Sequence, residues 1–136
     1  MLNKILCIDD DSITLMLCKK VISKAEFSHE IDTAHNGVDA LKYLDELIIK
    51  HQNEPNVILP QLIFLDLNMP VMNGWEFLDM FSQNNYNETF ANTKVIVLSS
   101  TIDPKDIEKS KSYPMVIDFL SKPITKEMLE LIKNIA

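Results

Sequence analysis

Glycine is scarce in this sequence, because only Gly37 and Gly74 occur among its 136 residues. A dinucleotide-binding fingerprint needs three glycines within six residues, and a P-loop needs two within six. Two glycines that lie far apart along the chain build neither motif. A glycine-rich loop that cradles phosphate is therefore excluded, whatever else the protein does with phosphate.

Arginine is absent altogether, so the 13 basic residues are all lysine. With 20 acidic residues, the formal net charge is −7 and the pI is about 4.8. Arginine is the usual bidentate ligand of phosphate and guanine, so an acidic chain without it is a poor candidate for binding nucleic acid. We therefore expect no nucleic-acid partner.

Cysteine is also rare, and Cys7 and Cys18 fall on different expected elements, so neither a disulfide framework nor a Cys-X-X-Cys site is indicated. Free thiols fit a reducing compartment. No apolar run approaches the length needed to span a bilayer, and the first residues lack a signal-peptide pattern. We expect a cytoplasmic protein without a membrane partner, and 136 residues predict a single domain.

The sequence does contain short, fully apolar runs, and three of them are followed directly by a polar residue. Runs of this kind are typical of strands that are buried on both faces of a sheet. With two weaker candidates added, the expected strands are residues 5–8, 30–34, 62–65, 95–98 and 115–120. Helices are expected at residues 12–24, 38–50, 74–81, 103–111 and 125–135, with polar connections at 51–60 and 84–93.

The alternation of these strands and helices predicts a doubly wound α/β fold, in which helices cover both faces of a five-stranded parallel sheet. Two strand orders are common for such sheets, and the order 2-1-3-4-5 suits five strands without a glycine fingerprint. Ligands of open α/β sheets bind at the carboxyl ends of the strands. We therefore expect the functional site at that edge.

Chemically active side chains stand at four of these strand ends, namely Asp9 and Asp10, Asp66, Ser99, and Lys122. Each has an ordinary structural explanation when taken alone, such as a helix N-terminus that favours acidic residues. Clustered carboxylates repel one another unless a cation compensates them, and hard oxygen ligands suit Mg²⁺. An aspartate can also attack phosphorus and form an aspartyl phosphate. Asp66 is the best candidate nucleophile, because it stands alone in the middle of this edge.

The sequence resembles the receiver domains of two-component response regulators, the CheY-like family. The resemblance rests on residues 5–10 (ILCIDD), 65–70 (LDLNMP) with Asn73-Gly74 behind them, 97–99 (VLS) and 120–123 (LSKP), and more weakly on 34–41 (AHNGVDAL). These segments extend along the whole chain in the family's order. The implied fold is flavodoxin-like, in agreement with the alternation of strands and helices.

By position, the resemblance implies that Asp66 accepts a phosphoryl group from a histidine kinase or a histidine phosphotransfer protein. It also implies that the side chains of Asp10 and Asp66 and the main-chain carbonyl of Asn68 bind Mg²⁺, while Asp9 assists through a water molecule. The protein would be a phosphoacceptor signalling domain that catalyses only its own phosphorylation and dephosphorylation. Its signal would pass on by conformational change or by a phosphorelay.

The resemblance assigns switch roles to further residues. Lys122 would pair with the phosphoryl group, and Pro123 would follow a cis peptide bond. Ser99 would be the hydroxyl that turns in to hydrogen-bond a phosphoryl oxygen. Phe119 lies at the family's aromatic switch position, where it lacks the hydroxyl that a tyrosine would bring.

Two other functions are compatible with parts of this pattern. A magnesium-dependent phosphatase of the haloacid dehalogenase type also uses an aspartate nucleophile on an α/β sheet. That class needs a second aspartate two residues after the first, where this sequence has Asn68. The other alternative is a receiver-fold interaction module that is never phosphorylated, and a phosphorylation test separates it from a receiver that accepts phosphate.

The matched segments occupy most of the chain, so we expect residues 1–136 to be one receiver domain with no output domain, unless the chain is a piece of a longer regulator. Seven of the ten residues from 13 to 22 are apolar, more than one buried face of a helix needs. The additional apolar residues either form a docking surface for the phosphoryl donor or belong to a large core. The helix at 103–111 has only Ile107 as an apolar anchor, so we expect it to move on phosphorylation.

Overall fold

Five parallel strands form one sheet in the order β2-β1-β3-β4-β5 in the computed structural model, which describes residues 1–133. This order, with parallel pairing throughout, confirms the doubly wound fold predicted from the sequence. Register places Ile8 opposite Leu65 and Asp66 opposite Leu98, so the carboxyl ends of the central strands meet at one edge. The strands are β1 (Leu2–Ile8), β2 (Ser28–Ala34), β3 (Leu62–Asp66), β4 (Lys94–Ser99) and β5 (Val116–Ser121).

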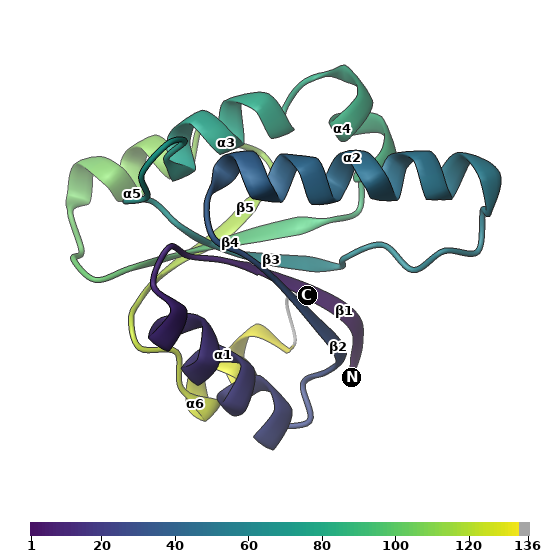
Figure 1. The fold of residues 1–136 in the computed structure, drawn as a ribbon. Helices are drawn as coiled ribbons and strands as arrows, with labels where there is room; N and C mark the ends of the chain where they lie inside the picture. Colours follow the sequence, from purple (N-terminus) through teal and green to yellow (C-terminus); the bar gives the residue numbers. More distant parts are fainter. Residues whose placement is uncertain (134–136) are drawn as a thin grey trace.

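Helices cover both faces of the sheet, with α1 and α6 on one face and α2, α3, α4 and α5 on the other (Figure 1). Within residues 1–133, no helix combines the length and the apolarity that crossing a membrane requires. The helices are α1 (Ser12–Lys24), α2 (Gly37–Asn53), α3 (Gly74–Phe81), α4 (Asn84–Thr89), α5 (Pro104–Ser110) and α6 (Lys126–Ile132).

Each face of the sheet carries its own apolar core. Leu6 and Ile8 of β1 pack in the cluster that includes α2 and α3, whereas Ile5 and Cys7 pack in the cluster that includes α1 and α6. Successive side chains of a strand point to opposite faces, so a strand covered on both sides has to be apolar at every position. This is why the central strands appear in the sequence as uninterrupted apolar runs.

The segment 84–93 was expected to be a polar connection without a helix, and that prediction is wrong, because it contains α4. Tyr86 packs against Phe81 and donates a hydrogen bond to Asp45 of α2 at 2.5 Å. Phe90 stacks on Phe81 with 5.9 Å between ring centroids. Two aromatic contacts with α3 therefore hold a segment whose remaining residues are mostly polar, and a local pattern does not reveal contacts of this kind.

The other differences concern the ends of elements. α2 continues to Asn53 although the expected helix ended at Lys50, and β1 begins at Leu2 although the expected strand began at Ile5. The last helix was expected at residues 125–135, and it begins with Thr125 as its N-cap. Residues 134 and 135 of that prediction lie outside the described residues.

Candidate functional site

Two buried carboxylates at the ends of neighbouring strands form the centre of the site. Asp66 is the last residue of β3, and Asp9 directly follows β1, the strand that pairs with β3. Each of these two residues is only 5% exposed, whereas Asp10 is exposed. One carboxylate oxygen from each of the three aspartates lies within 4.8 Å of the other two. The topology thus brings together acidic residues that are more than fifty positions apart in the chain.

Lys122 supplies the positive charge of this cluster. Its Nζ lies 2.5 Å from Oδ2 of Asp9 and 3.2 Å from Oδ1 of Asp66. Its backbone N–H donates to the carbonyl of Ser99 at 2.8 Å, which ties the residue after β5 to the end of β4. The peptide bond between Lys122 and Pro123 is cis, as the resemblance implied. A single ammonium group therefore bridges two carboxylates that stand at the ends of different strands.

Burial and charge both alter the ionisation of these groups. Burial, together with the negative charge of Asp9, raises the pKa of Asp66 to about 6, although the ammonium of Lys122 opposes the shift. For Lys122, burial disfavours the charged form, but its two carboxylate partners outweigh burial and raise the pKa of the ammonium. At neutral pH the lysine is therefore protonated, and Asp66 is mostly ionised and able to act as a nucleophile.

A glycine shapes the loop that follows Asp66. A Cβ atom on Gly74 would stand 2.6 Å from the carbonyl oxygen of Asp66 and 2.8 Å from Cα of Leu67, so a larger residue does not fit where α3 begins. Gly74 N–H donates to the carbonyl of Leu67 at 3.0 Å, and the N–H of Asn68 faces Oδ1 of Asp66 at 3.4 Å. The loop that carries Asn68 is therefore held close to the acidic cluster.

Asp11, the third residue of the acidic run Asp9-Asp10-Asp11, has a different role in the structure. Asp11 is exposed and is the N-cap of α1, where its carboxylate accepts hydrogen bonds from the N–H of Ile13 at 2.9 Å and the hydroxyl of Thr14 at 3.1 Å. The N–H of Asp11 donates to Oδ1 of Asp9 at 2.9 Å. The aspartates of this run thus have different roles, because Asp11 stabilises the N-terminus of α1 while Asp9 contacts the ammonium of Lys122.

Ser99 and Phe119 are not part of the charged cluster in this structure. Ser99 is buried at the end of β4, and its hydroxyl donates to the carbonyl of Thr101 at 2.6 Å and accepts from the N–H of Thr101 at 3.2 Å. Phe119 is half-buried on the edge strand β5, opposite Val97. Their switch roles therefore stay predictions, whereas Asp9, Asp10, Asp66 and Lys122 do lie together.

The sequence did not predict the cavity that lies beside Lys122. A small cavity of about 80 Å³ lies between α1 and the segment after β5, and Cys18 is part of its lining. Burial, with the nearby charge of Asp9, raises the pKa of the Cys18 thiol to about 11, so this cysteine stays protonated. No local pattern joins residues that are more than 100 positions apart. The cavity is lined by Thr14, Leu17, Cys18, Lys122, Pro123 and Ile124.

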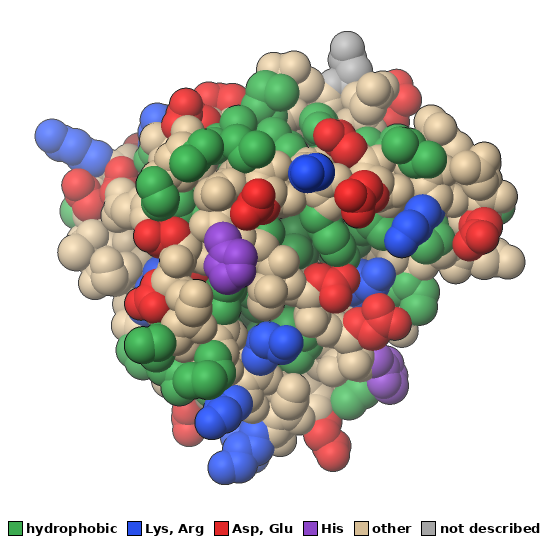
Figure 2. All heavy atoms as spheres, in the orientation of Figure 1, with side chains coloured by type: hydrophobic (Ala, Val, Ile, Leu, Met, Phe, Trp, Pro, Cys, Tyr) green, Lys and Arg blue, Asp and Glu red, His purple; other side chains and the backbone are tan. Residues whose placement is uncertain are grey.

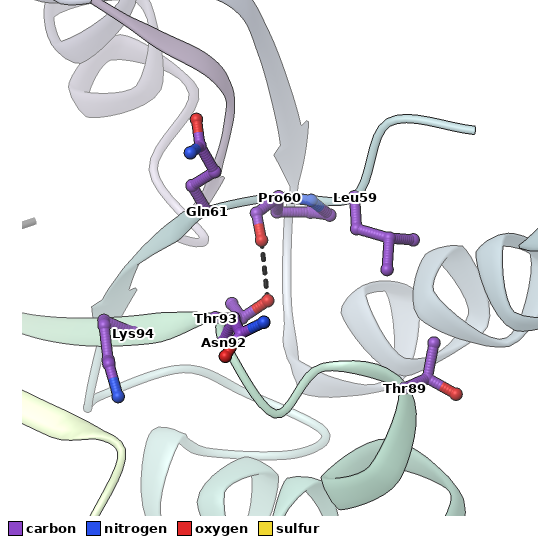
Figure 3. A pocket seen from close by; sticks show the side chains of 7 residues that line it. All are labelled: Leu59, Pro60, Gln61, Thr89, Asn92, Thr93 and Lys94. Atoms are coloured by element: carbon purple, nitrogen blue, oxygen red, sulfur yellow. Dashed lines mark hydrogen bonds between the residues drawn. The ribbon is translucent and has the colours of Figure 1, made fainter. Parts of the chain in front are cut away.

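A larger cavity, of about 370 Å³, lies at the opposite end of the sheet, where β3 and β4 begin (Figure 3). Thr93 closes part of it by donating a hydrogen bond to the carbonyl of Pro60 at 2.6 Å. Its lining consists of amide, hydroxyl and aliphatic groups with one lysine, Lys94. This cavity is therefore separate from the acidic cluster and does not share its chemistry.

The fold and the site define a flavodoxin-like α/β domain with an acidic cluster and a lysine at its carboxyl edge. The family model for the response regulator receiver domain matches residues 5–134. The crystal structure of a two-component response regulator from Cytophaga hutchinsonii is 32% identical, with a TM-score of 0.86, and the match covers 98% of this chain and 95% of that one. The chemotaxis response regulator CheY4 of Vibrio cholerae, at 22% identity and a TM-score of 0.75 over 100% of both chains, supports the fold.

A curated relative, the transcriptional regulatory protein HptR of Staphylococcus aureus, is 32% identical over 130 residues, which are 95% of this chain and 44% of that protein. The chain spans less than half the length of the curated relatives that it matches. The chain belongs to the response regulator receiver family of two-component signalling. The resemblance drawn from the sequence motifs is therefore confirmed.

Proposed function

We propose that Asp66 is the phosphoacceptor of this receiver domain and that Lys122 stabilises the transferred phosphoryl group. The observation that carries the proposal is the ammonium of Lys122, which lies 3.2 Å from Oδ1 of Asp66 at the end of β3. A positive charge placed beside the nucleophile offsets the charge on the phosphoryl oxygens during transfer. Asp9 holds this ammonium in position, because Nζ of Lys122 also contacts Oδ2 of Asp9.

The transfer itself is a displacement at phosphorus. A carboxylate oxygen of Asp66 attacks the phosphorus of an N-phosphorylated histidine, and the new O–P bond forms as the P–N bond breaks. The electron pair of the broken bond returns to the imidazole nitrogen, which takes up a proton. Asp66 suits this step because its pKa of about 6 leaves the carboxylate ionised at neutral pH.

The donor set fits a magnesium ion. Three carboxylate oxygens, from Asp9, Asp10 and Asp66, lie within 4.8 Å of one another, and oxygen ligands of this kind are the ones that Mg²⁺ takes in proteins. In the proposed site, Asp10, Asp66 and the main-chain carbonyl of Asn68 would hold the ion, and Asp9 would assist through water. When bound, Mg²⁺ supplies positive charge to the phosphoryl oxygens.

A labelling experiment tests the proposal. Wild-type protein, Asp66→Asn and the control Asp39→Asn, which alters an exposed aspartate of α2, are incubated with Mg²⁺ and labelled acetyl phosphate. We expect label on the wild type and on Asp39→Asn and none on Asp66→Asn. Label that survives hot acid, or label that Asp66→Asn retains, would contradict the aspartyl phosphate. Absence of label on all three proteins would favour the interaction module that is never phosphorylated.

We further propose that the phosphoryl donor is a histidine kinase or a phosphotransfer protein that docks on α1. The apolar excess predicted for this helix is on the surface, since Ile13 is 64% exposed, Met16 49% and Leu17 47%. Lysine side chains gather beside apolar ones over the region of α1 in Figure 2. α1 contains three exposed lysines and no acidic residue in a chain of net charge −7, which suits a donor surface that carries carboxylates around an apolar centre.

Met16→Glu is expected to slow phosphoryl transfer from a phosphorylated histidine phosphotransfer domain about tenfold, because a buried charge at the contact costs binding free energy. Labelling by acetyl phosphate should be unchanged, since a small donor needs no docking surface. Ile49→Glu, at an apolar position of α2 that is 59% exposed, is the matched control and should leave both rates unchanged. Equal transfer rates for Met16→Glu and wild type would end the docking proposal.

We propose that the chain acts as one receiver unit, because the family model matches residues 5–134 without interruption. The cytoplasmic location and the absence of a nucleic-acid partner stay predictions. The phosphatase alternative has no support, because the residue two positions after Asp66 is Asn68 and the family is that of receivers.

A further inference from the structure

α5 is packed against the rest of the protein by few apolar contacts. Among its seven residues only Ser110 is buried, and Ile107, its one apolar side chain of any size, is half-buried. Burial of an apolar face is what holds most helices in place. The position of α5 must therefore depend on other interactions.

Side chains of α3, which lies beside α5 in Figure 1, supply several such interactions. The ring of Trp75 on α3 stacks on the ring of Tyr113, which follows α5, with 6.0 Å between centroids. Nζ of Lys109 on α5 lies 4.5 Å from the centroid of the Trp75 ring. The hydroxyl of Tyr113 donates to Oδ1 of Asp79 on α3 at 2.6 Å. We call these four residues, Trp75, Asp79, Lys109 and Tyr113, the clasp.

The clasp joins the two helices whose preceding loops leave the site. α3 follows the loop that begins after Asp66, and α5 follows the short loop that begins after Ser99. The hydroxyl of Ser99 exchanges hydrogen bonds with Thr101 of that loop, and Asp103 at its end caps α5. Ser99 has to break its bonds with Thr101 before its hydroxyl reaches a phosphoryl group on Asp66. A rearrangement of this loop is passed directly to α5.

We propose that the clasp holds α5 in the position of the unphosphorylated state, so that phosphorylation of Asp66 works against it. The proposal rests on the proposed function, because it uses Asp66 as acceptor and Ser99 as switch hydroxyl. Contacts made in only one of two conformations favour that conformation, and weakening them shifts the population toward the other. Trp75, Asp79, Lys109 and Tyr113 are positioning residues, since they act on the site through α5.

The test compares two tyrosines that make the same kind of hydrogen bond. Tyr113→Phe keeps the ring on Trp75 but removes the bond to Asp79, whereas Tyr86→Phe removes the bond between α4 and Asp45, away from α5. Lys109→Met removes the cation over the indole ring and keeps most of the aliphatic chain. The readouts are the rate of labelling by acetyl phosphate in Mg²⁺ and amide hydrogen exchange over residues 104–113.

Tyr113→Phe and Lys109→Met are each expected to raise the labelling rate about two- to fivefold and to speed exchange over α5, while Tyr86→Phe leaves both unchanged. In the wild type, phosphorylation itself should speed exchange over α5. Faster exchange in the variants without faster labelling, or equal protection of α5 in both states of the wild type, would overturn the clasp. If the wild type takes no label, the proposed function fails and the clasp with it; label on the wild type with equal rates in all variants overturns the clasp alone.

Discussion

Asp66→Asn is expected to raise the free energy of unfolding of the metal-free protein at pH 7.5, although it removes the proposed acceptor. Burial and the charge of Asp9 raise the pKa of Asp66 from its ordinary value of 3.8 to about 6. Ionising this carboxyl therefore costs folding free energy, and a neutral amide does not incur that cost. Since one pKa unit corresponds to about 1.4 kcal/mol and solvent screens part of the effect, we expect a gain of roughly 1–2 kcal/mol.

The gain should depend on pH in a defined direction. The folded-state pKa of Asp66 lies above the unfolded-state value, so wild-type stability is fully present below about pH 4 and is lost as the pH rises through about 6. The difference between Asp66→Asn and wild type should therefore be near zero at pH 4 and largest above pH 7. Urea unfolding followed by the fluorescence of Trp75, the single tryptophan, measures it at each pH.

Magnesium provides the control for this prediction. In the proposed site, Mg²⁺ would bind the ionised carboxylates of the folded protein, so it should stabilise the wild type and reduce or reverse the advantage of Asp66→Asn. Asp39→Asn should show neither effect, because its side chain is exposed and lies outside the cluster. A stability difference that is constant from pH 4 to pH 8 would show that the effect is not the ionisation of Asp66.

Lys122→Met is expected to have the opposite effect on stability, with a loss of about 2–3 kcal/mol at pH 7.5 in the absence of metal. The variant leaves the buried carboxylates of Asp9 and Asp66 without the ammonium that lies 2.5 Å and 3.2 Å from them. Methionine retains most of the aliphatic length of lysine, so packing changes little. Labelling by acetyl phosphate should also slow about a hundredfold, because the positive charge that offsets the negative charge of the phosphoryl oxygens is gone.

Acidification separates the charge effect from other causes. At pH 5 most Asp66 side chains of the variant are protonated and the repulsion with Asp9 falls, so the stability deficit of Lys122→Met should shrink. Lys105→Met, which alters an exposed lysine of α5, is the control and should change neither stability nor labelling. A deficit of equal size at pH 5 and pH 7.5 would point to lost packing, and unaltered labelling would remove Lys122 from the proposed function.

Much of the fold and of the site follows from local patterns. The runs at residues 5–8, 62–65 and 95–98 had to be apolar throughout because both faces of the sheet are covered, so they identified the central strands. Polar residues directly after such runs lie at the carboxyl edge in any parallel sheet. This is why Asp9, Asp66 and Ser99 were expected at one edge before any distance was known, and Lys122 joined them because it follows the weaker strand at 115–120.

Other features had no local signal. α4 was missed because Tyr86 and Phe90 are held by Phe81 and by Asp45 on other elements. The clasp was missed because Trp75 and Tyr113 are far apart in the sequence, and neither is unusual in its own neighbourhood. Features of this kind depend on side chains that meet only after the chain has folded.

The sequence by itself determined the strand order, the edge at which the site lies, the family, and the exclusion of a glycine-rich phosphate loop. These depend on periodicity, on short motifs and on residues that are absent, all of which are visible along the chain. Only the tertiary structure decided that Lys122 pairs with Asp9 as well as Asp66, that Asp11 caps a helix, and that Ser99 bonds to Thr101. Pairing and hydrogen bonding depend on distances of a few ångströms between side chains, and packing sets those distances.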